Sequence, residues 1–393
     1  MQKAGVTKMS KQKRRDPLKV MIAWTVVLVL LVVGTWAAGT LLTNYRRSRL
    51  ISMREKVQEI NTQREQEYLL ALAEFDREQA ATQGANLSWP AQKTEGWDVI
   101  DLTSYPLENP VSIAATRAEA MHGGLLLVNE WHSRPADFDE SAMVPMYSYA
   151  GNRKNFGVQN SSQRLHPSAI EALLSALNDA KAVGLEHYVV SYAYRTYDEQ
   201  DQLFQKKMQE IVNAYGTRYQ GDALIARTKR DVNYPGTSEF NTGLSVTLYL
   251  YEKNNDELNK QKFSTSQQGV WLYENGWKYG LVFRFPGEDF PLEGTVDKTY
   301  KTGVSVPLNC YRYVGKAHAS VMHYFDFCLE EYIEYLQEHP HIAVFENGTL
   351  KYEIYRQYVG DDVSSFSVDV PQRARSYSMS LDNMGGVVTV CEY

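Results

Sequence analysis

The chain has 393 residues, of which 44% are hydrophobic and 22% are charged, as in ordinary globular proteins. A chain of this length has room for two or more folded units. Its formal net charge is −6, and its isoelectric point is about 5.8. Domains that bind nucleic acid are usually basic, so the composition excludes nucleic acid as a partner.

The amino-terminal region predicts a membrane anchor in the lipid bilayer. Residues 1–19 form a basic tail, and residues 20–42 carry no charged side chain. At about 1.5 Å per residue, this apolar run is long enough to cross a hydrocarbon core of about 30 Å. The basic excess before the run favours a cytoplasmic amino terminus and a single-pass protein of the cell membrane. A cleaved signal peptide and a buried core helix are the alternatives, although a signal peptide usually has a shorter apolar core.

Two connecting segments follow the apolar run. Residues 43–83 contain neither Gly nor Pro and predict a long juxtamembrane helical stalk. Four apolar residues of this segment have coiled-coil spacing before charged residues interrupt the pattern, so a homodimer through the stalk and a solitary spacer both stay open. Residues 84–124 contain several Trp and Pro residues and no clear period, which predicts an irregular arm.

The region 125–340 contains four informative segments. In chain order they read SYAYRTYDEQ (191–200), PGTSEFNTGLSVTL (235–248), WLYENGWKYGL (271–281) and PLNCYRYVG (307–315). Together and in this order they resemble the VanY-like D-alanyl-D-alanine carboxypeptidases, the M15B group of zinc peptidases. The resemblance implies an α+β fold, in which helices pack on a small antiparallel sheet and the metal cleft lies over that sheet.

The resemblance also implies where the zinc chemistry would lie, and these positions carry other residues. Phe240, Thr247 and Cys310 stand where the family has its His, Asp and His ligands, and Pro307 stands where it has the general-base Glu. A catalytic zinc needs three ligands with lone pairs, and its water needs a base. Phe240 has no lone pair, Thr247 offers a neutral hydroxyl, and only Cys310 could bind metal as a thiolate. We therefore expect no catalytic residue, no bound metal and no cofactor.

The substrate-binding positions are better retained. The resemblance implies that Arg195 and Gln200 face the terminal D-alanine of a substrate, with Ser238 of the second segment beside it. The planar fork of an arginine can donate two parallel hydrogen bonds to a terminal carboxylate. A surface or structural role for Arg195 is the alternative, since most exposed arginines are only solvated. Tyr192 replaces a small residue of the family and narrows the expected pocket.

Residues 341–393 predict a small β module. Three stretches of β-branched and aromatic residues lie in it, and Asp382–Gly385 reads as a turn. Its edge strand could pair with the main domain or with a partner, and a purely structural extension is the alternative. The three cysteines, Cys310, Cys328 and Cys391, allow at most one disulfide within the chain, and the sequence does not decide which.

Three functions are consistent with these patterns. The leading hypothesis is a membrane-anchored, extracytoplasmic pseudo-peptidase that binds D-alanine-terminated peptidoglycan stems through Arg195 and Gln200 without cutting them. The second is an active peptidoglycan carboxypeptidase in which Cys310 joins other residues in an altered metal or thiol site. The third is a non-enzymatic scaffold that holds a membrane protein partner in an assembly.

Overall fold

The structure is a computed structural model, and it describes residues 18, 22, 24–37, 39–41, 94–361 and 363–393. The stalk predicted at 43–83 lies outside the described residues, as does nearly all of the basic tail predicted at 1–19. Two compact units make up the chain, Met1–Leu72 and Ala73–Tyr393.

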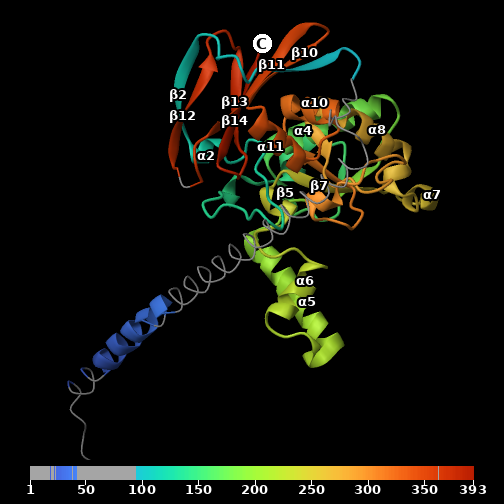
Figure 1. Cartoon of the computed structure of the whole chain (residues 1–393). Coiled ribbons are helices and arrows are strands. Elements are labelled where there is room, and N and C mark those ends of the chain that lie inside the picture. The colour runs from blue at the N-terminus through green and yellow to red at the C-terminus, as the bar shows by residue number, and fades with distance from the viewer. Residues whose placement is uncertain (1–17, 19–21, 23, 38, 42–93, 362) are drawn as a thin grey trace, which may run out of the picture. The chain divides into compact units, whose positions relative to one another are not determined.

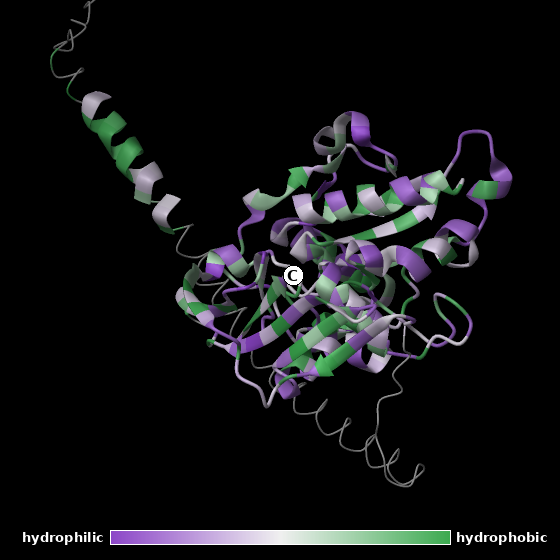
Figure 2. Cartoon of the chain, turned by 90° about the horizontal axis from the view of Figure 1, so that it is seen from above, coloured by the Kyte–Doolittle hydropathy of each residue, from purple (hydrophilic) through white to green (hydrophobic). Residues whose placement is uncertain are grey.

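The described part of the first unit is an apolar helix. It runs from Trp24 to Leu41, has a mean hydropathy of 2.0, and is long and apolar enough to cross a membrane. Figure 2 shows the predominance of hydrophobic residues along it. A signal sequence near an amino terminus would have the same composition, so the helix supports membrane anchoring without deciding the topology.

The second unit contains a five-stranded sheet that carries the motifs, called here the peptidase-like sheet. Its strands, in spatial order, are β4 (Gly157–Val158), β6 (Tyr188–Tyr192), β7 (Ser245–Leu250), β9 (Cys310–Tyr313) and β8 (Leu281–Phe283). Strand β4 runs parallel to β6, and the other neighbours are antiparallel. The α+β class expected from the sequence is therefore confirmed.

Helices α4 (Pro167–Ala182) and α8 (Gln267–Asn275) share a hydrophobic core with the peptidase-like sheet. Helix α4 begins with Pro167 at its first position, where the missing N–H costs nothing. In β7, Val246 and Leu248 belong to this core. Because successive side chains of a strand point to opposite faces, Ser245 and Thr247 point to the other face, where the predicted cleft should lie.

A helical hairpin projects from the second unit. It consists of α5 (Tyr197–Tyr215) and α6 (Asp222–Lys229), which extend together away from the sheets (Figure 1). Helix α5 begins with a capping box, in which the side chains of Thr196 and Glu199 each bond to the backbone of the other. The hairpin therefore starts at a fixed point directly after Arg195.

The carboxyl-terminal residues form a second five-stranded sheet, called here the module sheet. Its strands, in spatial order, are β1 (Trp97–Asp101), β10 (His341–Glu346), β11 (Thr349–Tyr358), β14 (Gly386–Glu392) and β13 (Ser376–Leu381). All neighbours in it are antiparallel. The β character predicted for this part of the chain agrees with these strands.

Both faces of the module sheet are covered. Helices α10 (Lys316–Phe325) and α11 (Leu329–Glu338) share one core with it. A two-stranded ribbon, β2 (Pro110–Thr116) paired with β12 (Ser365–Pro371), shares another core with it, together with the short helix α2 (Arg117–Ala120). Figure 1 shows the ribbon beside β13 and β14.

The arm predicted to be irregular over 84–124 contains two strands in its described part. Strand β1 forms an edge of the module sheet, and β2 forms half of the ribbon. The expectation of irregular structure is wrong for these residues. Both strands are short, and their partners β10 and β12 lie at the far end of the chain, so no local period reveals them.

Short elements complete the second unit: β3 (Val144–Pro145) pairs with β5 (Arg164–Leu165), and α3 (Met146–Ala150), α7 (Asp256–Asn259) and α9 (Thr299–Thr302) lie in the connections. One 3₁₀ turn, Glu239–Thr242, lies just before β7 and carries Phe240. All three cysteines are buried free thiols, so the structure forms none of the disulfides that the sequence allowed.

Candidate functional site

Two of the three positions where the family resemblance implies metal ligands, Thr247 and Cys310, lie side by side on adjacent strands. Tyr192 at the end of β6 pairs with Thr247 of β7, which in turn pairs with Cys310 of β9. Phe240 approaches from the 3₁₀ turn, and the centroid of its ring lies 6.4 Å from that of Tyr192. The sheet register thus assembles the predicted site, although the residues in it are not those of a zinc peptidase.

The hydroxyl of Thr247 is already engaged by protein groups. Its Oγ1 lies 2.7 Å from Oγ of Ser191, and the backbone N–H of Tyr192 donates to it at 3.1 Å. The register of β6 against β7 shifts between Val190 and Tyr192, which brings these groups onto one hydroxyl. Thr247 therefore acts as a hydrogen-bonding residue between two strands.

The thiol of Cys310 is sealed inside the protein. Its side chain has no exposed surface, and burial raises the pKa of the thiol far above its usual range. Metal binding and nucleophilic attack both require the thiolate, which burial disfavours here. The structure thus gives no support to a thiol site built on Cys310.

The guanidinium of Arg195 lies against two neighbouring aromatic rings, a place called here the notch. Its Cζ atom is 5.4 Å from the centroid of the Phe240 ring and 5.8 Å from that of Tyr192. Its Nη1 donates a hydrogen bond of 2.7 Å to Oε1 of Gln200. Burial lowers the pKa of the Arg195 guanidinium from its usual value, although the group stays protonated at neutral pH.

Gln200 joins Arg195 to the chain that returns from the helical hairpin. Its side chain is buried, and its Nε2 donates to the carbonyl oxygen of Asn233 at 2.7 Å. The amide therefore accepts from the guanidinium on one side and donates to the backbone on the other. The two residues predicted to bind substrate, Arg195 and Gln200, are thus in direct contact with each other.

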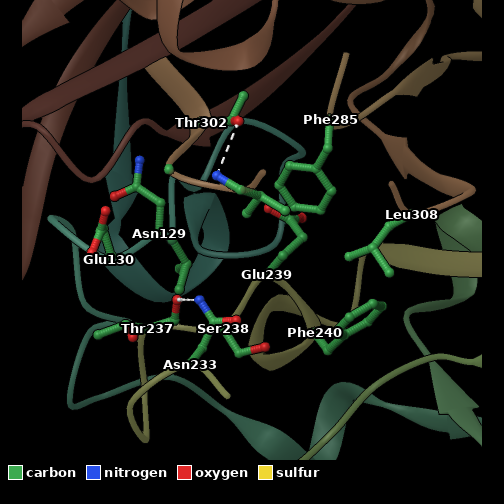
Figure 3. Close-up of a pocket in the computed structure, with 13 residues that line it drawn as sticks. Asn129, Glu130, Asn233, Thr237, Ser238, Glu239, Phe240, Phe285, Thr302 and Leu308 are labelled. Atoms are coloured by element: carbon green, nitrogen blue, oxygen red, sulfur yellow. Dashed lines mark hydrogen bonds between the residues drawn. The ribbon is translucent and has the colours of Figure 1, made fainter. Parts of the chain in front are cut away.

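Ser238, the third predicted binding residue, is buried and lines a neighbouring pocket of about 50 Å³. Figure 3 shows Phe240, Leu308 and Phe285 on one side of this pocket and Asn129 and Glu130 on the other. Arg195 and Gln200 are not among the residues that line it. Phe240 is the residue common to the pocket and to the notch around Arg195.

A network of buried charges that the sequence analysis missed fixes the 3₁₀ turn behind Phe240. Glu239 accepts hydrogen bonds from Arg312 at 2.5 Å and from Arg284 at 2.8 Å. Arg284 also makes two bonds to Glu330 of α11, at 2.7 and 2.9 Å. Burial alone would raise the pKa of Glu239, but the charges of Arg312 and Arg284 hold it below its usual value. A charged pair within the motifs 235–248 and 307–315 was the signal available in the sequence.

A family model described as D-alanyl-D-alanine carboxypeptidase, VanY, matches residues 162–315. A D-alanyl-D-alanine carboxypeptidase of Enterococcus faecium is 30% identical over 281 residues, which cover 72% of this chain and 79% of the relative. The putative carboxypeptidase YodJ of Bacillus subtilis is 32% identical over 211 residues, covering 53% of this chain and 67% of YodJ. This chain belongs to the VanY family of D-alanyl-D-alanine carboxypeptidases.

The fold of this chain resembles that of a solved structure. The vancomycin resistance D,D-dipeptidase VanXYg, determined in complex with a D-Ala-D-Ala phosphinate analogue, superposes with a TM-score of 0.52. The two proteins are 22% identical, and the match covers 72% of this chain and 99% of VanXYg. At this identity the likeness supports the fold.

The zinc ion that the family resemblance implies does not fit the residues present. Phe240 supplies no lone pair, the Thr247 hydroxyl already holds Ser191 and the Tyr192 N–H, and the Cys310 thiol is buried in protonated form. Pro307, at the position of the general base, has no group that accepts a proton. Among the residues that the structure describes, no three His, Cys, Asp or Glu side chains cluster as a metal site.

Proposed function

We propose that this protein is a membrane-anchored, extracytoplasmic member of the VanY family that binds peptides ending in D-alanine without cleaving them. The state of Arg195 is the observation that carries the proposal. Its guanidinium is partly buried, and no described carboxylate lies within ion-pair distance of it, while the charge of Glu199 acts on it from farther away. A cation that has lost part of its water gains most from an anion brought by a ligand.

Other buried arginines of the chain support this interpretation. Arg284 and Arg312 share Glu239, and Arg134 pairs with Glu140 at 2.8 Å. The fold therefore places a carboxylate beside these cations, while Arg195 is held by a neutral amide and two rings. A ligand carboxylate would take the role that Glu239 plays elsewhere in the structure.

The class of ligand follows from the family. The relatives include D-alanyl-D-alanine carboxypeptidases, whose names describe peptides with a carboxyl-terminal D-alanine. Such a peptide offers a terminal carboxylate for the fork of Arg195 and a single methyl group beside it. A peptidoglycan stem peptide is therefore the ligand that we propose.

The absence of cleavage is proposed from the side chains at the former metal positions. Hydrolysis of the peptide bond would need an activated water and a base. Phe240, Thr247 and Pro307 supply neither the lone pairs nor the base. The family fold would then present the peptide terminus without attacking it.

The proposed location rests on the first unit. Its helix Trp24–Leu41 supports a membrane anchor, and the basic residues of 1–19 support a cytoplasmic amino terminus. The peptide-binding unit would then lie outside the cytoplasm, where stem peptides of the cell wall are found.

Isothermal titration of the full chain in detergent with a peptide ending in D-Ala-D-Ala tests the proposal. We expect binding that Arg195→Gln weakens by about tenfold to a hundredfold, because a charge-assisted bidentate contact is lost. The same peptide with an amidated carboxyl terminus should bind as weakly to the native protein as the free acid binds to Arg195→Gln.

Arg153→Gln is the matched control, since Arg153 is an exposed arginine paired with Glu171. It should leave the affinity unchanged. No binding by the native chain at millimolar peptide would overturn the receptor proposal and favour a scaffold. Release of D-alanine that depends on zinc and stops with a chelator would instead show an active carboxypeptidase.

A further inference from the structure

The two aromatic residues beside Arg195 define an unusual anion site. Tyr192 is 56% exposed, whereas the guanidinium beside the rings is partly buried. The two rings are inclined by 52°, and their centroids lie 6.4 Å apart. Because the Cζ atom of Arg195 lies 5.4 and 5.8 Å from these centroids, the three groups form a triangle, and both rings pack on the same side of the guanidinium.

The backbone fixes Arg195 against the turn that carries Phe240. The N–H of Arg195 donates to the carbonyl oxygen of Phe240 at 2.9 Å, and the side chain of Asn241 donates to the carbonyl oxygen of Arg195 at 2.7 Å. These two bonds hold the backbone of Arg195 against the turn. The fold therefore keeps the backbones of Arg195 and Phe240 side by side.

The turn itself is rigid because the buried charge network holds it. Glu239, the residue next to Phe240, accepts hydrogen bonds from Arg284 and Arg312. It also accepts one from the hydroxyl of Ser245, at 2.6 Å. Movement of the backbone at this turn would strain these buried charge-assisted bonds. The backbone of Phe240 is thus held in place, and Phe240 occupies the position where the family has a zinc ligand.

The electrostatics of the notch favour a guanidinium with free donors. Each ring face attracts the cation through its quadrupole without taking any of its N–H groups. Within the described chain, the hydrogen bond from Nη1 to Gln200 is the one that the guanidinium makes to a protein acceptor. Several N–H groups of the fork therefore stay available to an incoming anion.

We propose that Phe240 and Tyr192 form an aromatic clamp that positions Arg195 as a metal-independent site for a ligand carboxylate. The clamp replaces the anchoring that a metal centre would give and keeps the fork oriented before the ligand arrives. The exposed ring of Tyr192 offers an apolar surface to a small aliphatic group next to the carboxylate. The clamp rests on the proposed function and specifies how the same site recognises its peptide.

The test measures the affinity of the full chain in detergent for the D-Ala-D-Ala peptide by titration, with and without a chelator. We expect Phe240→Leu and Tyr192→Leu each to weaken binding by about twofold to thirtyfold, the range of a cation–π contact. Tyr192→Phe should bind as the native protein does, because the ring is kept. Affinity of the native chain should not change when the chelator is added.

Tyr147→Leu is the matched control, because Tyr147 is also an exposed tyrosine with a cation over its ring, Lys154 at 4.1 Å. It should leave the affinity unchanged. Thermal melting of each variant separates loss of the clamp from loss of the fold, and Tyr192 is exposed enough to be replaced without unfolding.

The outcomes separate the two proposals. If the native chain does not bind the peptide, the proposed function fails. If it binds and both leucine variants bind equally well, the function stands and the clamp is wrong. Binding that requires zinc, or that Phe240→His strengthens in the presence of zinc, would also overturn the clamp.

Discussion

Two sets of arginines in this protein have different neighbours. Around Glu239, Arg284 and Arg312 form ion pairs with carboxylates of the protein, so their charges are neutralised within the fold and the cluster is called here closed. At Arg195, the neighbours are two rings and an amide, and no described carboxylate completes the pair. We infer that the first cluster holds the structure, and we propose that the second arginine receives a ligand anion.

The largest effect should come from breaking the closed cluster. Glu239→Gln leaves two buried arginines with too little negative charge, and we expect it to lower the free energy of unfolding by about 3 to 5 kcal/mol. Chemical denaturation measures this. The control is Glu171→Gln, which breaks the exposed pair with Arg153 and should cost less than about 1 kcal/mol. Equal effects for the two variants would contradict the structural role of the cluster.

The importance of the planar fork at Arg195 can be tested by a substitution that keeps the positive charge and changes the shape of the side chain. Arg195→Lys retains the cation but loses the planar fork, so we expect about tenfold weaker peptide binding with little change in unfolding free energy. Titration and denaturation of the same sample measure the two quantities. A lysine variant that binds as tightly as the native chain would show that charge alone is recognised.

A smaller effect is expected at the former metal position in β7. Thr247→Val removes the acceptor of the Tyr192 N–H and the partner of the Ser191 hydroxyl, which should cost about 1 kcal/mol of unfolding free energy. Thr217→Val, at an exposed residue of the hairpin, is the control and should change little. An unchanged stability of Thr247→Val would show that the hydroxyl is dispensable between the strands.

A further charged cluster lies in the module sheet, and it should make the free energy of unfolding depend on pH. His341 lies with Nε2 2.8 Å from a Glu353 carboxylate oxygen and Nδ1 3.2 Å from the carbonyl oxygen of Tyr105. Both partners accept, so the imidazole meets both only when protonated. Tyr393 also donates to Glu353, and the guanidinium of Arg373 lies 3.7 Å from it.

These contacts determine the sign of the pH effect. Burial alone would lower the pKa of His341, but Glu353 and the Tyr105 carbonyl raise it above its usual value. The stabilisation is complete below the unfolded pKa of about 6.5 and is lost as the pH rises through the higher folded pKa. The difference in unfolding free energy between the native chain and His341→Gln should therefore be larger at about pH 6 than at about pH 8. A difference that grows with pH would contradict this.

The sequence predicted the features whose chemistry is local. The order of the motifs predicted the family and the α+β class. The SYAYRTYDEQ segment named Arg195 and Gln200, which the structure places in contact with each other. Strands β1 and β2 were missed because their partners lie at the other end of the chain. Ser238, also predicted to bind substrate, lines a neighbouring pocket together with Phe240.

The charge network escaped sequence reasoning for a physical reason. Glu239 and Arg312 lie in separate motifs, and a charged residue in a sequence is normally assigned to the surface. Only the register of β7 against β9, with Ser245 opposite Arg312, brings them together in the interior. The roles of Arg195, Gln200 and Ser238 in binding stay predictions for the titrations to decide.

The projecting hairpin of α5 and α6 is held at its base by Gln200. In the first turns of α5, the carbonyl group of Gln200 accepts a hydrogen bond from Arg195, and its amide donates one to the returning chain at Asn233. Helix α5 has 19 residues and is roughly 28 Å long, so the tip of the hairpin lies far from this joint. A substitution of Gln200 would therefore act on the base of the hairpin and on the setting of Arg195 together.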